Sequence, residues 1–122
     1  MSTERTLSQL FDLRGKTALI SGAGGWLGSA MSRALAEAGA SVITTSRDAA
    51  KAAECAASLP SNSGQNHFGV ALDHLDEASI ENGFTDALLR AGRIDILINN
   101  GHAANGSDLT TVTGEEFNRS LA

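Results

Sequence analysis

Residues 21–28 (SGAGGWLG) decide the fold, because they join a short apolar run at 16–21 (KTALIS) to a helix-like pattern at 26–38. Glycine allows a tight turn, a close approach of backbone to phosphate, and close packing of a helix on a strand. The free N–H groups and the positive dipole at the start of that helix would then face an anion. The stretch therefore predicts a phosphate-binding turn, with a glycine-rich turn that binds no ligand as the alternative.

On either side of this turn, the period of the apolar residues alternates. Short apolar or β-branched runs predict strands at 16–21, 41–46, 67–72 and 94–98. Apolar residues three or four apart predict helices at 26–38, 48–59, 76–91 and 113–121, with loops at 60–66 and 99–111. Strands that alternate with helices form right-handed crossover units around a parallel sheet. We therefore predict an α/β fold, a Rossmann-type doubly wound parallel sheet of about four strands in the order 3-2-1-4, which is incomplete.

Local signals mark the ends of these helices. Gly39 follows the first helix, where a glycine cap belongs, and Asp48 is a cap for the second. Thr113 and Glu116 have the spacing of a capping box. In the third helix, one face carries the apolar residues Ile80, Phe84, Ala87 and Leu88.

Composition limits the class of protein. A chain of 122 residues is long enough for one domain, and its net charge of -5 without a basic block argues against nucleic acid and membrane surfaces as partners. No apolar run approaches the roughly 18–20 residues of a membrane helix, and residues 1–9 lack an apolar signal core. Cys55 is the single cysteine, so no internal disulfide can form. These features predict a cytoplasmic protein.

The glycine turn resembles the Thr-Gly-x-x-x-Gly-x-Gly turn of the short-chain dehydrogenases/reductases, with Ser21 in the threonine position and Trp26 in place of the middle glycine. Gly22, Gly25 and Gly28 also match the Gly-x-x-Gly-x-x-Gly turn of the extended branch, the nucleotide-sugar epimerases and dehydratases. Residues 10–16, 95–101 and 113–117 resemble the compact branch. The resemblance implies a single NAD(P)-binding Rossmann domain over residues 1–122, truncated at the C-terminal end. It assigns cofactor contacts to Ser21, Gly22, Gly24, Gly25, Trp26, Leu27, Gly28, Ser46, Arg47, Leu72, Asp73, Asn99, Asn100 and Gly101.

The end of the second predicted strand bears on the choice of dinucleotide. An acidic residue there would bind the ribose 2′-hydroxyl of NAD, but this chain has Ser46 and Arg47. Arginine makes a charge-assisted contact to phosphate, so the pair favours NADP, with NAD as the alternative. The competing interpretation is a solvated Arg47 before a helix, and the nearby Asp48 weakens the contrast. Asp73, after Leu72, matches the family's adenine-binding aspartate, with a helix cap as its alternative role.

Asn99, Asn100 and Gly101 follow the fourth strand and resemble the family's Asn-Asn-Ala-Gly segment, which lines the cofactor cleft. An amide side chain both donates and accepts, and so can satisfy backbone groups at a strand end. His102 departs from the motif, and we interpret it as a polar loop residue. The histidines are scattered, and we predict no metal site.

The catalytic groups of the family do not have matches here. The resemblance implies a Tyr-x-x-x-Lys pair for proton transfer, but the chain contains no tyrosine. We therefore predict no catalytic residues and an inactive chain. Residues 94–98 would also form an exposed apolar edge, so we expect poor stability or a partner that covers this strand.

The leading interpretation is the cofactor-binding half of an oxidoreductase that acts on a small alcohol or carbonyl compound, such as a sugar acid or polyol, and that is a homo-oligomer at full length. A second is a dinucleotide-binding or regulatory module that does not catalyse. A third is a fragment of an extended-branch enzyme that modifies nucleotide sugars.

Overall fold

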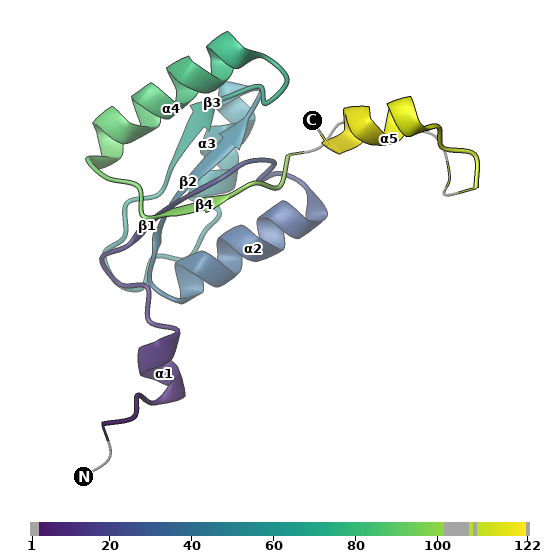
Figure 1. Ribbon diagram of the computed structural model, residues 1–122. Coiled ribbons are helices and arrows are strands. Elements are labelled where there is room, and N and C mark those ends of the chain that lie inside the picture. Colours follow the sequence, from purple (N-terminus) through teal and green to yellow (C-terminus); the bar gives the residue numbers. More distant parts are fainter. Residues whose placement is uncertain (1–2, 102–107, 109, 122) are drawn as a thin grey trace.

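The computed structural model describes residues 3–101, 108 and 110–121, and its centre is a parallel sheet (Figure 1). The strands are β1 (Thr17–Ile20), β2 (Ser41–Ser46), β3 (Phe68–Ala71) and β4 (Ile96–Ile98). They form a 4-stranded sheet in the order β3-β2-β1-β4. Neighbouring strands pair in parallel, with Leu19 opposite Ile43 on one side and Leu97 on the other. The predicted fold class and strand order are confirmed.

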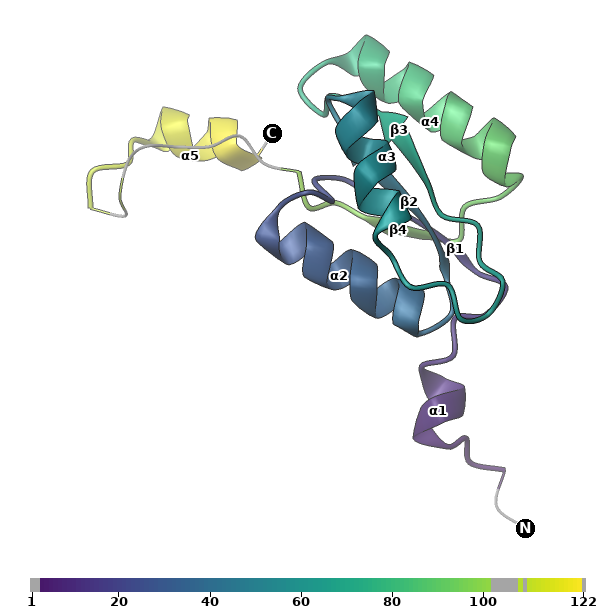
Figure 2. The ribbon, with the colours of Figure 1, turned by 180° about the vertical axis from the view of Figure 1, so that it is seen from behind.

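Helices cover both faces of the sheet. On one face lie α2 (Trp26–Glu37) and α3 (Ala49–Ala57), and on the other lies α4 (Glu77–Ala91), as the two opposite views show (Figures 1 and 2). The predicted helices are confirmed to within a few residues at each end. The helix α5 (Gly114–Leu121) and the short α1 (Leu7–Leu10) both project away from the sheet.

The core consists of two apolar layers, one on each face of the sheet. Leu19, Ile43 and Val70 pack together with Ala87 of α4. On the opposite face, Ile20 and Val42 of β1 and β2 pack with Ala23 and Ala36 from the loop and helix that follow β1. Successive residues of a strand point to opposite faces, so a strand that is apolar throughout is buried on both sides, as expected of a parallel sheet.

The predicted helix signals operate as expected. The Asp48 carboxylate accepts the N–H groups of Ala50 (2.8 Å) and Lys51 (3.4 Å) at the start of α3. Thr113 and Glu116 form the predicted capping box before α5. Gly39 has a φ of 105° after α2, which is the left-handed geometry of a glycine cap. The sequence thus specifies where these helices begin and end.

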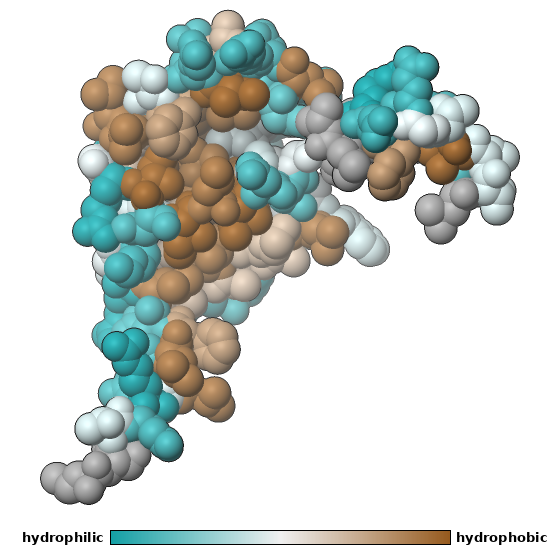
Figure 3. All heavy atoms as spheres, viewed as in Figure 1, coloured by the Kyte–Doolittle hydropathy of each residue, from teal (hydrophilic) through white to brown (hydrophobic). Residues whose placement is uncertain are grey.

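The β4 side of the sheet is less covered than the rest. Among the described residues β4 pairs with β1 alone, and Leu97 in its middle is 56% exposed. Beside it, Ile80, Phe84 and Leu88 of α4 are 39–43% exposed, although Ala87 on the same helix is fully buried. Apolar atoms are prominent on this side of the molecule (Figure 3). The expected exposed edge is therefore present in the part of the chain that the structure describes.

Candidate dinucleotide-binding site

The glycine loop between β1 and α2 has a geometry that excludes side chains at two positions. Gly22 has a φ of 65°, which L-residues rarely adopt. A Cβ on Gly28 would lie 1.9 Å from the Gly22 carbonyl oxygen and 2.8 Å from Asn100 Nδ2. The first turn of α2 can therefore approach the loop closely only because residue 28 is glycine.

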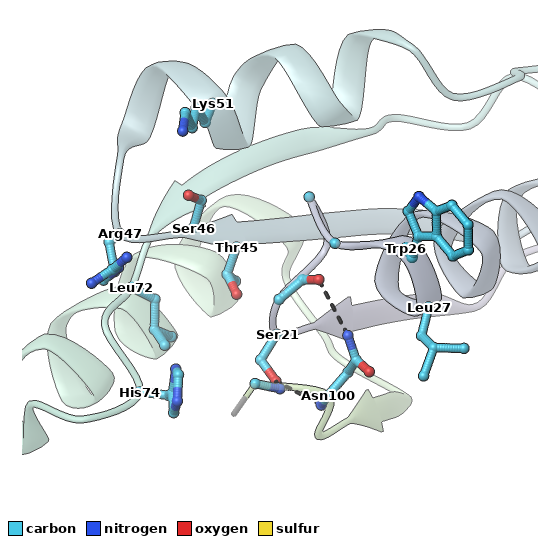
Figure 4. Close-up of a pocket in the computed structure, with 14 residues that line it drawn as sticks. Ser21, Trp26, Leu27, Thr45, Ser46, Arg47, Lys51, Leu72, His74 and Asn100 are labelled. Carbon is cyan, nitrogen blue, oxygen red and sulfur yellow. Dashed lines mark hydrogen bonds between the residues drawn. The ribbon is translucent and has the colours of Figure 1, made fainter. Parts of the chain in front are cut away.

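Ser21 joins the glycine loop to the end of β4 (Figure 4). Its buried hydroxyl oxygen accepts the backbone N–H groups of Asn100 and Gly101, each at 2.9 Å. In return, the Asn100 side-chain amide donates to the Gly22 carbonyl at 3.2 Å. We call these contacts among Ser21, Gly22, Asn100 and Gly101 the Ser21–Asn100 clamp. It fixes the ends of two strands, far apart in sequence, at one edge of the sheet.

The start of α2 lacks a side-chain cap. Gly25 is its N-cap residue and makes no side-chain hydrogen bond, in contrast to the aspartate caps of α3 and α4. The first N–H groups of a helix need partners from outside its own turns. Together with the helix dipole, they form an anion-binding end at the loop.

The end of β2 supplies cationic and hydroxyl groups on the other side of the same space. Arg47 is exposed, and Ser46 Oγ accepts the Asp48 N–H at 3.3 Å. Asp48 itself caps α3, so its carboxylate is engaged by that helix. Lys51, in the first turn of α3, also lines this space (Figure 4).

These elements surround a cavity of about 530 Å³. The predicted cofactor residues that it brings together are Ser21, Gly22, Gly24, Gly25, Trp26, Leu27, Ser46, Arg47, Leu72, Asn100 and Gly101. Trp26 is 96% exposed beside it, so its indole packs on little of the described chain. The cavity lies at the carboxyl ends of the strands, where doubly wound sheets bind their ligands.

Three predicted residues do not line this cavity. Gly28 acts in packing, as described above, and Asn99 is exposed after β4. The Asp73 carboxylate accepts the Leu75 N–H at 3.0 Å within the turn before α4. The cap of α4 is Asp76, so the alternative role of Asp73 as a helix cap is wrong. Its contact to adenine stays a prediction.

Sequence reasoning missed three residues that line the cavity: Thr45, Lys51 and His74. The place of Lys51 in the first turn of α3 was a usable signal, because that helix begins directly after Arg47 and the Asp48 cap. His74 gave no such signal. Its imidazole packs on Gly101, where a Cβ would lie 2.9 Å from Nδ1. His102, interpreted as a polar loop residue, lies outside the described residues.

Taken together, a doubly wound parallel sheet and a glycine loop that opens onto a cavity at its carboxyl edge define a dinucleotide-binding protein of the Rossmann class. The family model described as short chain dehydrogenase matches residues 16–122. The chain therefore belongs to the short-chain dehydrogenase family.

Individual relatives agree with this assignment. The chain is 33% identical over 124 aligned residues to D-threitol dehydrogenase of Mycolicibacterium smegmatis, an alignment that covers 100% of this chain and 47% of the relative. It is 32% identical to elsinochrome reductase 1 of Elsinoe fawcettii, covering 90% of this chain and 41% of the relative. The chain thus spans less than half the length of these curated relatives.

A solved structure shares the fold as well. The 3-ketoacyl-(acyl-carrier-protein) reductase of Brucella melitensis, crystallised with NADH, superposes with a TM-score of 0.71 at 35% identity. The match covers 90% of this chain and 44% of that chain.

In the described part of this chain, no helix is both long and apolar enough to cross a membrane.

Proposed function

We propose that residues 1–122 form the cofactor-binding unit of an NAD(P)-dependent short-chain oxidoreductase that acts on an alcohol or carbonyl group, as in a sugar acid or polyol. The observation that carries the proposal is the uncapped start of α2, which borders the cavity next to the Ser21–Asn100 clamp. The first N–H groups of α2 need hydrogen-bond partners, and a phosphate bound in the cavity would supply them.

The residues present fit a dinucleotide. Gly24 and Gly25 leave the loop free of side chains where a pyrophosphate would approach the first N–H groups of α2. Leu72 offers an apolar wall for adenine, with Asp73 next to it in the chain. When bound, the nicotinamide group would accept or donate hydride. The protein's own part is to hold the dinucleotide at this edge of the sheet.

We propose that NADP is preferred over NAD. Arg47 and Lys51 place two cationic side chains at the end of β2, and Ser46 lies next to them. A carboxylate that would repel a 2′-phosphate is lacking at position 46, and Asp48 is engaged as a helix cap. Charge-assisted hydrogen bonds to phosphate favour the phosphorylated cofactor.

Titration of the purified chain with NADPH and NADH, followed by reduced-nicotinamide fluorescence, tests both statements. We expect NADPH to bind at least about tenfold more tightly, since a hydrogen bond to a charged group contributes about 1.5–3 kcal/mol. Arg47→Ala should weaken NADPH binding and leave NADH binding unchanged. Arg119→Ala, which removes an exposed guanidinium from α5, is the matched control. Equal affinities for the two cofactors would contradict the NADP preference, and binding of neither would contradict the proposed function.

We further propose that the 122-residue chain does not catalyse by itself, because it contains no tyrosine to serve as the family's proton donor. Steady turnover of a polyol or ketone by the purified chain would contradict this. A non-catalytic dinucleotide-binding module is the second candidate function, and the lack of tyrosine is the observation that favours it.

A further inference from the structure

A second cavity, of about 300 Å³, lies behind the glycine loop, between α2 and α3. Its walls include Ala23 and Gly24 of the loop, Ser29 and Ser32 of α2, and Cys55 of α3. Gly24 also lines the dinucleotide cavity, so one residue separates the two spaces. A change in the second cavity can therefore reach the loop directly.

Cys55 is the single cysteine of the chain, and its thiol is free. Its Sγ lies 3.6 Å from the position that a Cβ would take on Gly24, which is van der Waals contact with the side of the loop that bears no side chain. Cys55 is half-buried and lines the second cavity, so its sulfur has room beside it. A group attached to this sulfur can enter that room, which Gly24 also lines.

Ser32 gives a second, independent observation about the same cavity. The residue is 1% exposed, and its hydroxyl has no hydrogen-bond partner among the described residues. A buried hydroxyl without a partner is costly, and such groups are usually satisfied by protein, water or ligand. A polar ligand group in the second cavity, such as a peptide amide, would satisfy it.

We propose that Cys55 is a site of covalent modification by small peptide disulfides of the glutathione class, and that the adduct in the second cavity displaces the glycine loop and weakens dinucleotide binding. The coupling to binding rests on the proposed function, whereas the modification itself does not.

The reaction is a thiol–disulfide exchange. The thiolate of Cys55 attacks one sulfur of the small disulfide, the old S–S bond breaks, and a new S–S bond to Cys55 forms. The departing sulfur leaves as a thiolate and takes up the proton that Cys55 lost. Cys55 is thereby oxidised, and one sulfur of the reagent is reduced, with no other oxidant required.

The test begins with glutathione disulfide and the 122-residue chain. Intact mass should show one adduct, and Cys55→Ser should show none. In the adduct, the dissociation constant for NADPH should rise at least tenfold. Binding linkage requires that saturating NADPH lower the equilibrium constant for adduct formation by the same factor.

The matched control moves the thiol to the outer side of α3. Cys55→Ser combined with Ala57→Cys places it on an exposed residue two positions along the helix. This variant should form the adduct without a change in NADPH affinity. An adduct on Cys55 that leaves the affinity unchanged, or an equal loss of affinity in the control, would overturn the proposed coupling. Failure of Cys55 to react would overturn the site.

If the unmodified chain binds no dinucleotide, the proposed function fails, and the modification site is judged separately. Amide hydrogen exchange at Gly24 and Gly25 then tests whether the adduct displaces the glycine loop. Faster exchange in the Cys55 adduct than in the Ala57→Cys adduct supports displacement of the loop. Equal exchange in the two adducts overturns it.

Discussion

The two sides of the sheet differ in how fully their apolar side chains are buried. Around β1 and β2, side chains such as Ile20 and Ile43 are buried, and the loop that follows β1 is held by the Ser21–Asn100 clamp. At β4, Leu97 is more than half exposed and the strand pairs on one side among the described residues. The comparison teaches that dinucleotide binding and folding stability both depend on the side around β1 and β2, whereas self-association depends on the β4 side. Substitutions on the two sides should therefore have separable effects.

The largest expected effect is that of Gly28→Ala on the glycine loop. The new Cβ would lie 1.9 Å from a backbone oxygen, so α2 or the loop must move. We expect a loss of about 3 kcal/mol in the free energy of unfolding, the upper range for overpacking, and loss of measurable NADPH binding. Gly114→Ala, where a Cβ meets nothing within 4 Å, is the control. Urea unfolding and NADPH titration check both, and a wild-type-like Gly28→Ala variant would refute the packing argument.

Ser21→Ala tests the clamp with a smaller change. It removes the acceptor of two backbone N–H groups, those of Asn100 and Gly101. We expect a destabilisation of about 2 kcal/mol, the cost of buried donors left without partners, together with weaker NADPH binding. Ser21→Thr keeps the hydroxyl and should restore most of both. If Ser21→Thr is as damaged as Ser21→Ala, the hydroxyl is not what holds the two strands.

On the β4 side, Leu97→Lys should change association more than stability. The side chain is already largely exposed, so we expect a change within about 0.5 kcal/mol in the free energy of unfolding. The wild-type chain should self-associate as its concentration rises, because its apolar edge is uncovered, and the lysine should oppose this. Sedimentation velocity measures both, with Leu89→Lys on α4 as a control. A wild-type chain that is monomeric at every concentration would remove the basis of this prediction.

The smallest effect concerns acid stability. A hydrogen bond from Arg93 holds the pKa of Asp95 below its ordinary value, helped by the Thr17 N–H. Arg14 lowers the pKa of Asp12 in the same way, to about 2. A carboxyl whose pKa is lower in the folded state stabilises the fold above its ordinary pKa and loses that contribution as the pH falls through the folded value. The melting temperature should therefore decrease between about pH 4 and pH 2.

Asp95→Asn should give a shallower decrease over the same pH range, because its side chain no longer titrates. Asp86→Asn, which alters an exposed pair on α4, serves as the control and should follow the wild-type curve. If the melting temperatures of wild type and Asp95→Asn fall in parallel with pH, the Asp95 carboxylate does not contribute to the acid dependence of stability.

Much of the fold was predictable because local sequence patterns determine where its strands and helices form. The strands and helices follow from apolar periodicity, and the order of the strands follows from right-handed crossovers. The short helix α1 was missed because four residues are too few for an apolar period to be recognised. It is formed by a capping box between Thr6 and Gln9, a signal that is visible in the sequence once such pairs are sought.

The site was predictable in part. The glycine loop and the residues after β2 and β4 were found because their spacing along the chain is itself the signal. His74 and the second cavity were not, because their positions depend on which segments meet in space. His67 illustrates the same limit: its ring accepts the Val42 N–H at 3.0 Å and bonds the Pro60 carbonyl at 2.8 Å, a structural role that periodicity does not indicate.

The most direct test of the dinucleotide site is to record the amide chemical shifts of the ¹⁵N-labelled chain as NADPH is added. We predict that the largest changes fall on Gly24 and Gly25 of the loop, on Arg47 after β2, and on Gly101 after β4, with small changes at α1 and α4. Saturating NADPH that leaves the shifts of the glycine loop unchanged would contradict the account.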